Sequence, residues 1–349
     1  MLIGMHALDY GLVGLFLMSV LAVGAYFANQ HKTVTDYCAG GRSLPWIATG
    51  ISAALTLLAA HLFITVPSEA YVVGFKGLLA PIGVCLAVPI ALLVVMPLMH
   101  KLDVLSIYEF LEFRFDHVVR LLVAGVWIAW RLLLIAVVVA VPCRALGIAC
   151  GGFPPAWSWI VIVGLIATGY TAIGGLKAVV WTDVVQMFAV GVALLAIVGT
   201  VWWSLDDGSA TVLQVAEDYG RDQIADLQFS WSDSWSFFNA LPLFVLLMLA
   251  MSTIDQTVMQ RLTAVEKARR CQRGYLLGAV GLALLLAALT YLGVGLFAFY
   301  HQNQNSLRPM WVVNLDNQTD QPLTFADRDR LWPNLQTNSQ GNPHEPLVA

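Results

Sequence analysis

The chain has 349 residues, of which 59% are hydrophobic and 11% charged, and its formal net charge at pH 7 is −4. A composition this apolar excludes an ordinary water-soluble domain. Because no stripe of basic residues is present, we expect no nucleic-acid partner. Apolar runs recur at the ~20-residue length that crosses a bilayer, which predicts an all-α integral membrane protein.

Eight apolar segments are long enough to span a membrane. They cover residues 7–28, 46–73, 78–99, 121–146, 157–174, 181–204, 236–258 and 273–300. If the N-terminus lies outside, most basic residues fall in the inner loops, as the positive-inside rule requires. We therefore predict a multi-pass domain over residues 1–300 and a polar extracytoplasmic tail over 301–349. The plasma membrane, which in bacteria is the inner membrane, is the expected location.

The second span contains residues that are rare in a lipid-facing helix: His61, Thr65, Pro67 and Glu69. Proline removes a backbone donor and disturbs the preceding turn. Freed backbone groups are tolerated at membrane depth only against protein or water. This pattern predicts a broken helix, which transporters use to coordinate ions. A simple proline kink, with Glu69 already in the outer interface, remains the alternative.

The fourth span carries a charge inside its apolar run, Arg131. An arginine there can extend to the inner face or pair within the bundle, and we expect the first. The preceding loop, 100–120, has the pattern of a short amphipathic helix at the membrane surface. Residues 205–235 form an acidic outer loop that we expect to be solvated. The five scattered cysteines show no metal or disulfide spacing and should pack as small hydrophobic side chains.

A carboxylate, Asp183, stands at the mouth of the sixth span, within the segment GGLKAVVWTDVVQ at 174–186. A charge at the edge of hydrocarbon is unfavourable unless it faces the protein interior or a water-filled path. Thr182 and Asp183 could instead cap the N-terminus of a helix. At the inner end of the seventh span, Asp255 and Gln256 also lie where the hydrocarbon ends.

At these residues the chain resembles the sodium:solute symporter family. The segment 174–186 resembles that family's loop into its fifth core helix. The stretch from Asp255-Gln256 to Gln260-Arg261 resembles the element at the end of core helix six. The broken second span resembles core helix one, and residues 36–42 resemble the first inner loop. Together these matches cover roughly residues 1–300.

The resemblance implies a LeuT-like bundle, in which an extra N-terminal helix precedes five-plus-five helices arranged as an inverted repeat. Substrate and ion would lie between the broken helices. Sodium-binding roles fall to the backbone carbonyls of Leu55 and Leu58 and, on the exit path, to Asp183. The residues implied for the substrate site are His61, Leu62, Asp255 and Gln256. Sodium would be the coupling ion, and no cofactor or enzymatic activity is expected.

The resemblance also implies that the second repeat is incomplete, because the chain ends after the counterpart of core helix seven. The hydroxyl ligands that complete the family's sodium site lie on core helix eight. We therefore expect a sodium-coupled symporter of a small solute, represented by part of its chain. A membrane solute-sensing module and a non-transporting truncated remnant are the alternatives. An intramembrane enzyme using His61, Glu69 and Asp183 is disfavoured, because no nucleophile accompanies them.

Overall fold

A computed structural model describes residues 7–27, 33–97, 107–150, 154–227, 233–253 and 255–302. These residues are almost entirely helical, and the only pairing of β type among them is an isolated bridge between Ser43 and Val265. The chain divides into two compact units, Met1–Leu296 and Phe297–Ala349. The description below concerns the first unit. Nearly all of the predicted tail lies outside the described residues.

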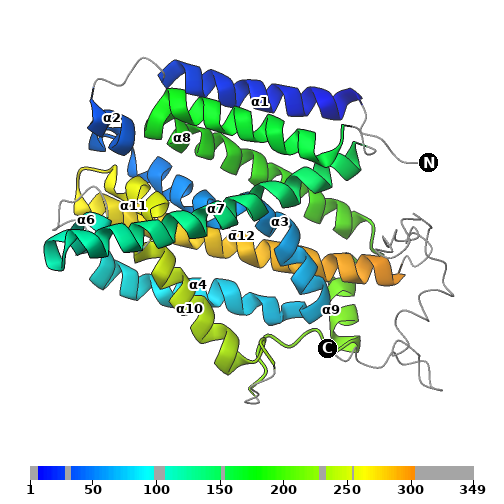
Figure 1. Ribbon diagram of the computed structural model, residues 1–349. Helices are drawn as coiled ribbons and strands as arrows, with labels where there is room; N and C mark the ends of the chain where they lie inside the picture. Colours follow the sequence, from blue (N-terminus) through cyan, green and yellow to red (C-terminus); the bar gives the residue numbers. More distant parts are fainter. Residues whose placement is uncertain are drawn as a thin grey trace, which may run out of the picture. The chain divides into compact units, whose positions relative to one another are not determined.

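The described chain is a succession of helices (Figure 1). In order they are α1 (Ala7–Phe27), α2 (Val34–Ala39), η1 (Gly40–Arg42), α3 (Trp46–Val73), η2 (Gly74–Leu78), α4 (Leu79–Ile90), η3 (Ala91–Val95), α6 (Ile107–Arg114), α7 (His117–Ala149), α8 (Ala156–Trp203), α9 (Ser209–Asp218), α10 (Phe237–Thr253), α11 (Gln256–Thr263) and α12 (Ala268–Gln302). Helix α1 packs along α8, α3 packs against α7, α8 and α11, and α10 packs against α4.

Four helical stretches among the described residues are long and apolar enough to cross a membrane, and the bent pair α10–α11 would make a fifth. Two of the four, Trp46–Val94 and Ala156–Trp203, contain 49 and 48 residues. At 1.5 Å per residue each is more than twice as long as the ~30 Å hydrocarbon core. Each contains a glycine at positive φ, Gly74 (69°) and Gly175 (56°), where the chain can turn. Each stretch therefore accommodates two of the predicted spans, and the total of eight stays a prediction.

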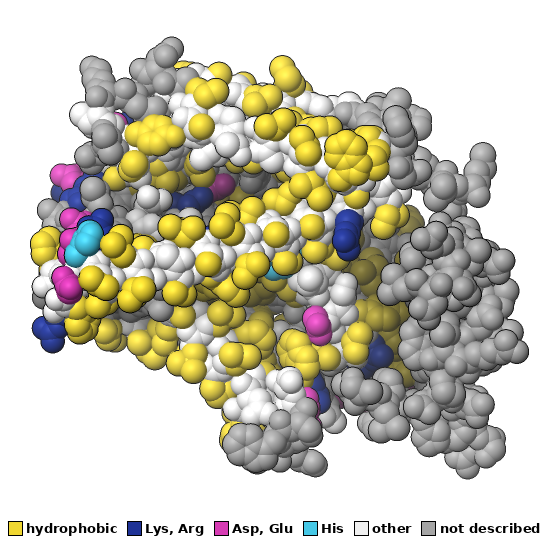
Figure 2. Space-filling model, in the orientation of Figure 1, with side chains coloured by type: hydrophobic (Ala, Val, Ile, Leu, Met, Phe, Trp, Pro, Cys, Tyr) yellow, Lys and Arg dark blue, Asp and Glu magenta, His cyan; other side chains and the backbone are white. Residues whose placement is uncertain are grey.

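Large apolar side chains cover most of the face seen in Figure 2. On α7, for example, Leu121, Leu122, Val126 and Leu133 are all exposed. A continuous apolar surface of this kind would cause aggregation in water. In a bilayer it is the ordinary lipid-facing surface of a helix bundle, because lipid tails are as apolar as leucine.

The second predicted span is broken, as the sequence indicates, and the break lies at Ala59; the alternative of a simple kink at Pro67 is wrong. Ala59 has φ 24° and ψ 143°, whereas the torsion angles around Pro67 stay helical and its ring is buried. A non-glycine residue at positive φ is uncommon and marks local strain. The sequence pointed to the proline because its effect on a helix is general. The break at Ala59 depends instead on tertiary packing.

The outer segment between α8 and α10 is more ordered than the predicted solvated loop. It contains α9, whose Val212, Val215 and Ala216 are buried. Beyond α9, Arg221 donates to the carbonyl of Tyr71 near the end of α3. The repeat of apolar residues at helical spacing gives α9 one buried face despite the acidic composition around it. The cysteine prediction is confirmed for Cys143, Cys150 and Cys271, which are buried and form no disulfide.

Helices α3 and α12 approach each other through glycines on both sides of the break. Gly50 lies against the backbone of Gly274 and Gly278, and Gly293 lies against Pro67 and Ala70. Small residues allow such close backbone contact between membrane helices. The broken helix is therefore held against α12 above and below its irregular segment.

This contact predicts that Gly50→Ala destabilises the bundle. An alanine Cβ at this position would overlap the carbonyl oxygen of Gly274, which is backbone and cannot rotate away. We expect a loss of about 1–3 kcal/mol, the usual effect of overpacking, seen as a lower midpoint of thermal unfolding in detergent. Gly125→Ala on α7 is the matched control, because nothing lies within 4 Å of its new methyl group. Equal midpoints for the two variants would contradict the close contact.

Candidate functional site

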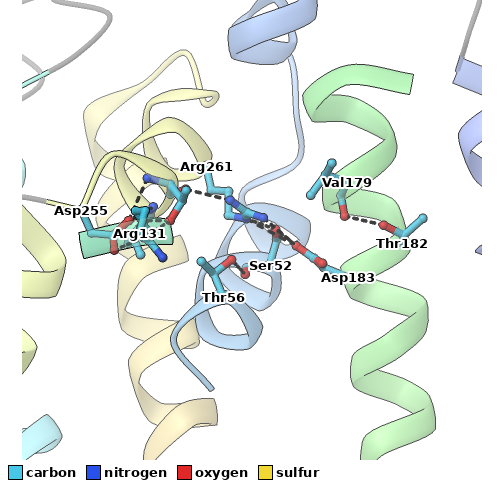
Figure 3. A network of polar contacts seen from close by, with 10 residues as sticks. Ser52, Thr56, Arg131, Val179, Thr182, Asp183, Asp255 and Arg261 are labelled. Carbon is cyan, nitrogen blue, oxygen red and sulfur yellow. Dashed lines mark hydrogen bonds and ion pairs between the residues drawn. The ribbon is translucent and has the colours of Figure 1, made fainter. Parts of the chain in front are cut away.

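A buried ion pair joins three elements of the bundle, α3, α8 and α11 (Figure 3). Asp183, in the second half of α8, pairs with Arg261 of α11, whose Nη2 lies 3.3 Å from Oδ2 of the aspartate. The hydroxyl of Ser52, on α3, donates to the same carboxylate. Arg261 Nε in turn donates to Ser52 Oγ at 2.7 Å. Both charged side chains are only 11% exposed, so Asp183 faces the protein interior.

The capping alternative for Thr182 and Asp183 does not hold. The second half of α8 follows the non-helical residue Gly175, so both residues lie well inside this helix. The hydroxyl of Thr182 donates to the carbonyl of Val179, 2.9 Å away, and caps nothing. The carboxylate is therefore held by tertiary partners and not by a helix terminus.

A second ion pair lies at the first turn of α11. Arg131 of α7 pairs with Asp255 and also donates to Thr257 Oγ1 at 2.6 Å. Asp255 is the N-cap of α11 and accepts hydrogen bonds from the amides of Thr257 (2.8 Å) and Val258 (3.4 Å). The expectation that Arg131 extends to the inner face is therefore wrong. With a buried carboxylate within reach, pairing satisfies both charges inside the bundle.

The two ion pairs belong to one polar network. Arg261 Nη1 donates to the carbonyl of Thr257 at 2.8 Å, while the hydroxyl of Thr257 receives the hydrogen bond from Arg131. Among the described residues, these are the only ion pairs in which both side chains are less than 20% exposed. The formal charges of the four residues sum to zero. Removing one partner would leave an uncompensated buried charge.

The face of the molecule drawn in Figure 2 contains a hollow with charged side chains at its floor. The visible face is hollowed between α8 and α7, and basic and acidic atoms are seen at the bottom of the hollow. The apolar surface elsewhere on this face makes the charged floor stand out. Water or an ion in this hollow would meet charged groups directly.

The break in α3 lies about two helical turns beyond Ser52. The residues just before Ala59 are those whose backbone carbonyls would bond amides across the irregular torsion angles. Leu58, one of the two residues assigned to sodium, is fully buried there, and Leu55 is half-buried one turn earlier. Backbone carbonyls at such breaks are the usual cation ligands of broken transporter helices.

The residues assigned to the substrate fall into two groups. His61 and Leu62 are half-buried just after the break, and the Nδ1 atom of His61 is buried without a hydrogen-bond partner. Asp255 and Gln256 lie together at the start of α11. Helices α10 and α11 lie at 58° to each other, and only together are they long and apolar enough to cross a membrane.

Sequence reasoning missed the partner of Asp183. By the positive-inside rule Arg261 is one more basic residue of an inner loop, and no local pattern separates it from Lys267, Arg269 and Arg270. Ser52 gave no signal, because a single serine in an apolar helix is common. Whether Arg131 pairs within the bundle or extends to the membrane surface depends on how close the start of α11, with Asp255, lies to α7.

Long apolar helices, a broken span, a bent helix pair and buried charges beside them are the architecture of secondary transporters. The chain belongs to the sodium:solute symporter family, whose profile matches residues 37–320. It is 30% identical over 299 residues to the human Sodium/iodide cotransporter, covering 84% of this chain and 46% of that protein. It is 29% identical over 301 residues to the Sodium/sialic acid symporter NanT of Aliivibrio fischeri, covering 86% and 59%.

A solved structure agrees with the sequence matches. A Na⁺-coupled sialic acid symporter in a substrate-bound outward-open state superposes with a TM-score of 0.82 at 25% identity, covering 86% of this chain and 64% of that one. The predicted all-α, LeuT-like bundle is thereby confirmed. The chain spans about half the length of the two relatives named above, 46% and 59%.

The strained torsion angles at Ala59 give a direct test of the break. We expect Ala59→Gly to raise the free energy of unfolding by about 1–3 kcal/mol, because glycine tolerates positive φ. Ala60→Gly, one residue further in regular helix, should lower it by about 1 kcal/mol. Thermal unfolding of both variants in detergent measures the difference. A loss of stability in both would mean that Ala59 lies in a regular helix.

Proposed function

We propose that this chain is part of a sodium-coupled symporter that moves a small solute across the plasma membrane by alternating access. The observation that carries the proposal is the buried Asp183–Arg261–Ser52 cluster beneath the break in α3. In a member of this family, such a cluster joins the sodium-binding region to a charge that must change partners. A solute-sensing module, a non-transporting remnant and an enzyme each lack a comparable observation in their favour.

In this proposal the carbonyls of Leu55 and Leu58 contribute oxygen ligands to sodium, which binds where the helix is interrupted. Asp183 lies on the path by which the ion leaves toward the inside. Since Arg261 already neutralises this carboxylate, a departing sodium ion competes with the guanidinium for it. Because the formal charges of the network already sum to zero, a sodium ion at Asp183 would leave Arg261 as an uncompensated buried charge unless its guanidinium moved away, so release of the ion requires α11 to move.

The solute would bind beside His61 and Leu62 and near Asp255 and Gln256. Two of the relatives carry anions by name, iodide and sialic acid, and another is named a Sodium-coupled monocarboxylate transporter. Anions are therefore the first solutes to try. Sodium binding would favour the state that binds solute, and by thermodynamic linkage the solute would raise sodium affinity by the same factor.

Asp183 has two roles in this proposal: it neutralises Arg261, and it contacts sodium on the exit path. Variants of the complete protein can separate the two roles. Asp183→Asn alone leaves Arg261 buried without its partner, and we expect about 3–5 kcal/mol of destabilisation together with loss of transport. The double variant Asp183→Asn/Arg261→Gln removes both charges and should regain most of the stability. If Asp183 handles sodium, the double variant should still fail to transport.

The measurement is sodium-driven uptake into proteoliposomes, with iodide, sialic acid and lactate as the solutes offered, beside thermal unfolding of the same preparations. Arg261→Gln alone is the control for the loss of the guanidinium. Wild-type sodium dependence in the stable double variant would show that Asp183 only neutralises Arg261, and the assigned role would be wrong.

A further inference from the structure

A groove on the outside of the bundle is lined by residues that take no part in the polar network, although it shares helix α8 with Asp183. It has a volume of about 610 Å³ and opens between the C-terminal half of α1 and the second half of α8. Its lining residues are Ala22, Val23, Tyr26, Phe27, Trp181 and Val185. Tyr26 is 70% exposed and Trp181 37% exposed, so the groove faces the surroundings of the bundle and not its interior.

Helix α1 packs along α8, and the closest approach that the glycines allow lies before Gly175, ahead of the groove residues Trp181 and Val185. Gly24 of α1 packs directly against Tyr170 and Gly174 of α8. Residues with larger side chains, before and after this contact, hold the two helix backbones further apart. Beyond Gly175 the second half of α8 runs on past Trp181 and Val185. The space between the helices is lined there by aromatic and aliphatic groups alone.

A positive charge stands at one end of this groove. Lys177, Trp181 and Val185 are spaced four residues apart and share one face of α8, so Lys177 lies one turn beyond the apolar lining. Its aliphatic stem lies beside Gly40 of η1, where a Cβ would be 3.6 Å from Lys177 Cγ. The ammonium group forms no ion pair with any described carboxylate. The positive-inside rule places this end of the groove at the inner surface.

An apolar groove with a cationic end is complementary to a phospholipid, which the membrane supplies in abundance. An acyl chain fits the lining, and a phosphate group fits beside an unpaired lysine. Tyrosine and tryptophan side chains are preferred at the depth of lipid headgroups, where one end of the ring is apolar and the other polar. The transported solute is a poor occupant, because the groove lies outside the bundle and lacks polar groups along its length.

We propose that this groove binds an anionic glycerophospholipid of the inner leaflet, with an acyl chain between α1 and α8 and the phosphate at Lys177. The lipid would fill the space between the extra N-terminal helix and the core of the bundle. This site is independent of the proposed sodium and solute sites, which lie on α3, α8 and α11.

The test is native mass spectrometry of the complete protein titrated with dioleoyl phosphatidylglycerol or dioleoyl phosphatidylcholine. Wild-type protein should retain phosphatidylglycerol preferentially. Lys177→Gln should weaken phosphatidylglycerol binding about fivefold, the usual contribution of one basic residue near anionic lipid, and leave phosphatidylcholine binding unchanged. Trp181→Ala should weaken the binding of both lipids. Lys177→Arg keeps the charge and should behave as wild type.

Lys267→Gln is the matched control, since Lys267 is an exposed lysine just before α12 and far along the chain from the groove. If Lys177→Gln and Lys267→Gln lower phosphatidylglycerol binding equally, the preference is a general surface effect and the site is wrong. Loss of the preference in Lys177→Arg would also contradict it. A dimer that persists after delipidation and dissociates in Trp181→Ala would show that a second copy occupies the groove instead.

Discussion

The position of Asp183 depends on one constraint: a carboxylate enclosed by apolar helices must find compensating partners inside the bundle. Arg261 supplies the opposite charge and Ser52 a hydrogen-bond donor, and both come from elements distant in sequence. The pair therefore ties α11 and the inner half of α3 to α8. Any motion that separates these elements must first provide another partner for the carboxylate.

This requirement connects stability with transport. Sodium, the cation in the family's name, can replace the guanidinium at Asp183 only if Arg261 finds another partner or reaches water, because the formal charges of the network already sum to zero. The second pair, Arg131–Asp255, anchors the other end of α11 to α7. The two pairs together hold the short helix α11. Thr257 links them, because its carbonyl accepts from Arg261 and its hydroxyl accepts from Arg131. Breaking one pair would release one end of α11 and leave the other end held.

Much of the bundle could be predicted from the sequence, because hydrophobic length alone locates membrane helices. The interior-facing position of Asp183 could be predicted from the cost of a charge at the hydrocarbon edge. The partners could not be predicted, since they depend on which helix faces which in three dimensions. Arg131 shows this directly: its pairing with Asp255 required the start of α11 to lie against α7.

The break in α3 shows a second limit. Proline at position 67 gave the local signal, yet the interruption occurs at Ala59, which has no special backbone preference. The glycine contacts of α3 with α12 fix the helix on both sides, so the irregular torsion angles fall between them. Such strain is imposed by packing and is invisible in a local pattern.

The central claim, that sodium binds at the break in α3, is tested most directly by hydrogen–deuterium exchange of the purified complete protein in sodium and in potassium. The account predicts slower exchange in sodium for the amides around Ala59, because a bound ion orders the interrupted turn. Amides of α7 around Gly125 should exchange equally in both ions. Identical exchange around Ala59 in the two ions would contradict the account.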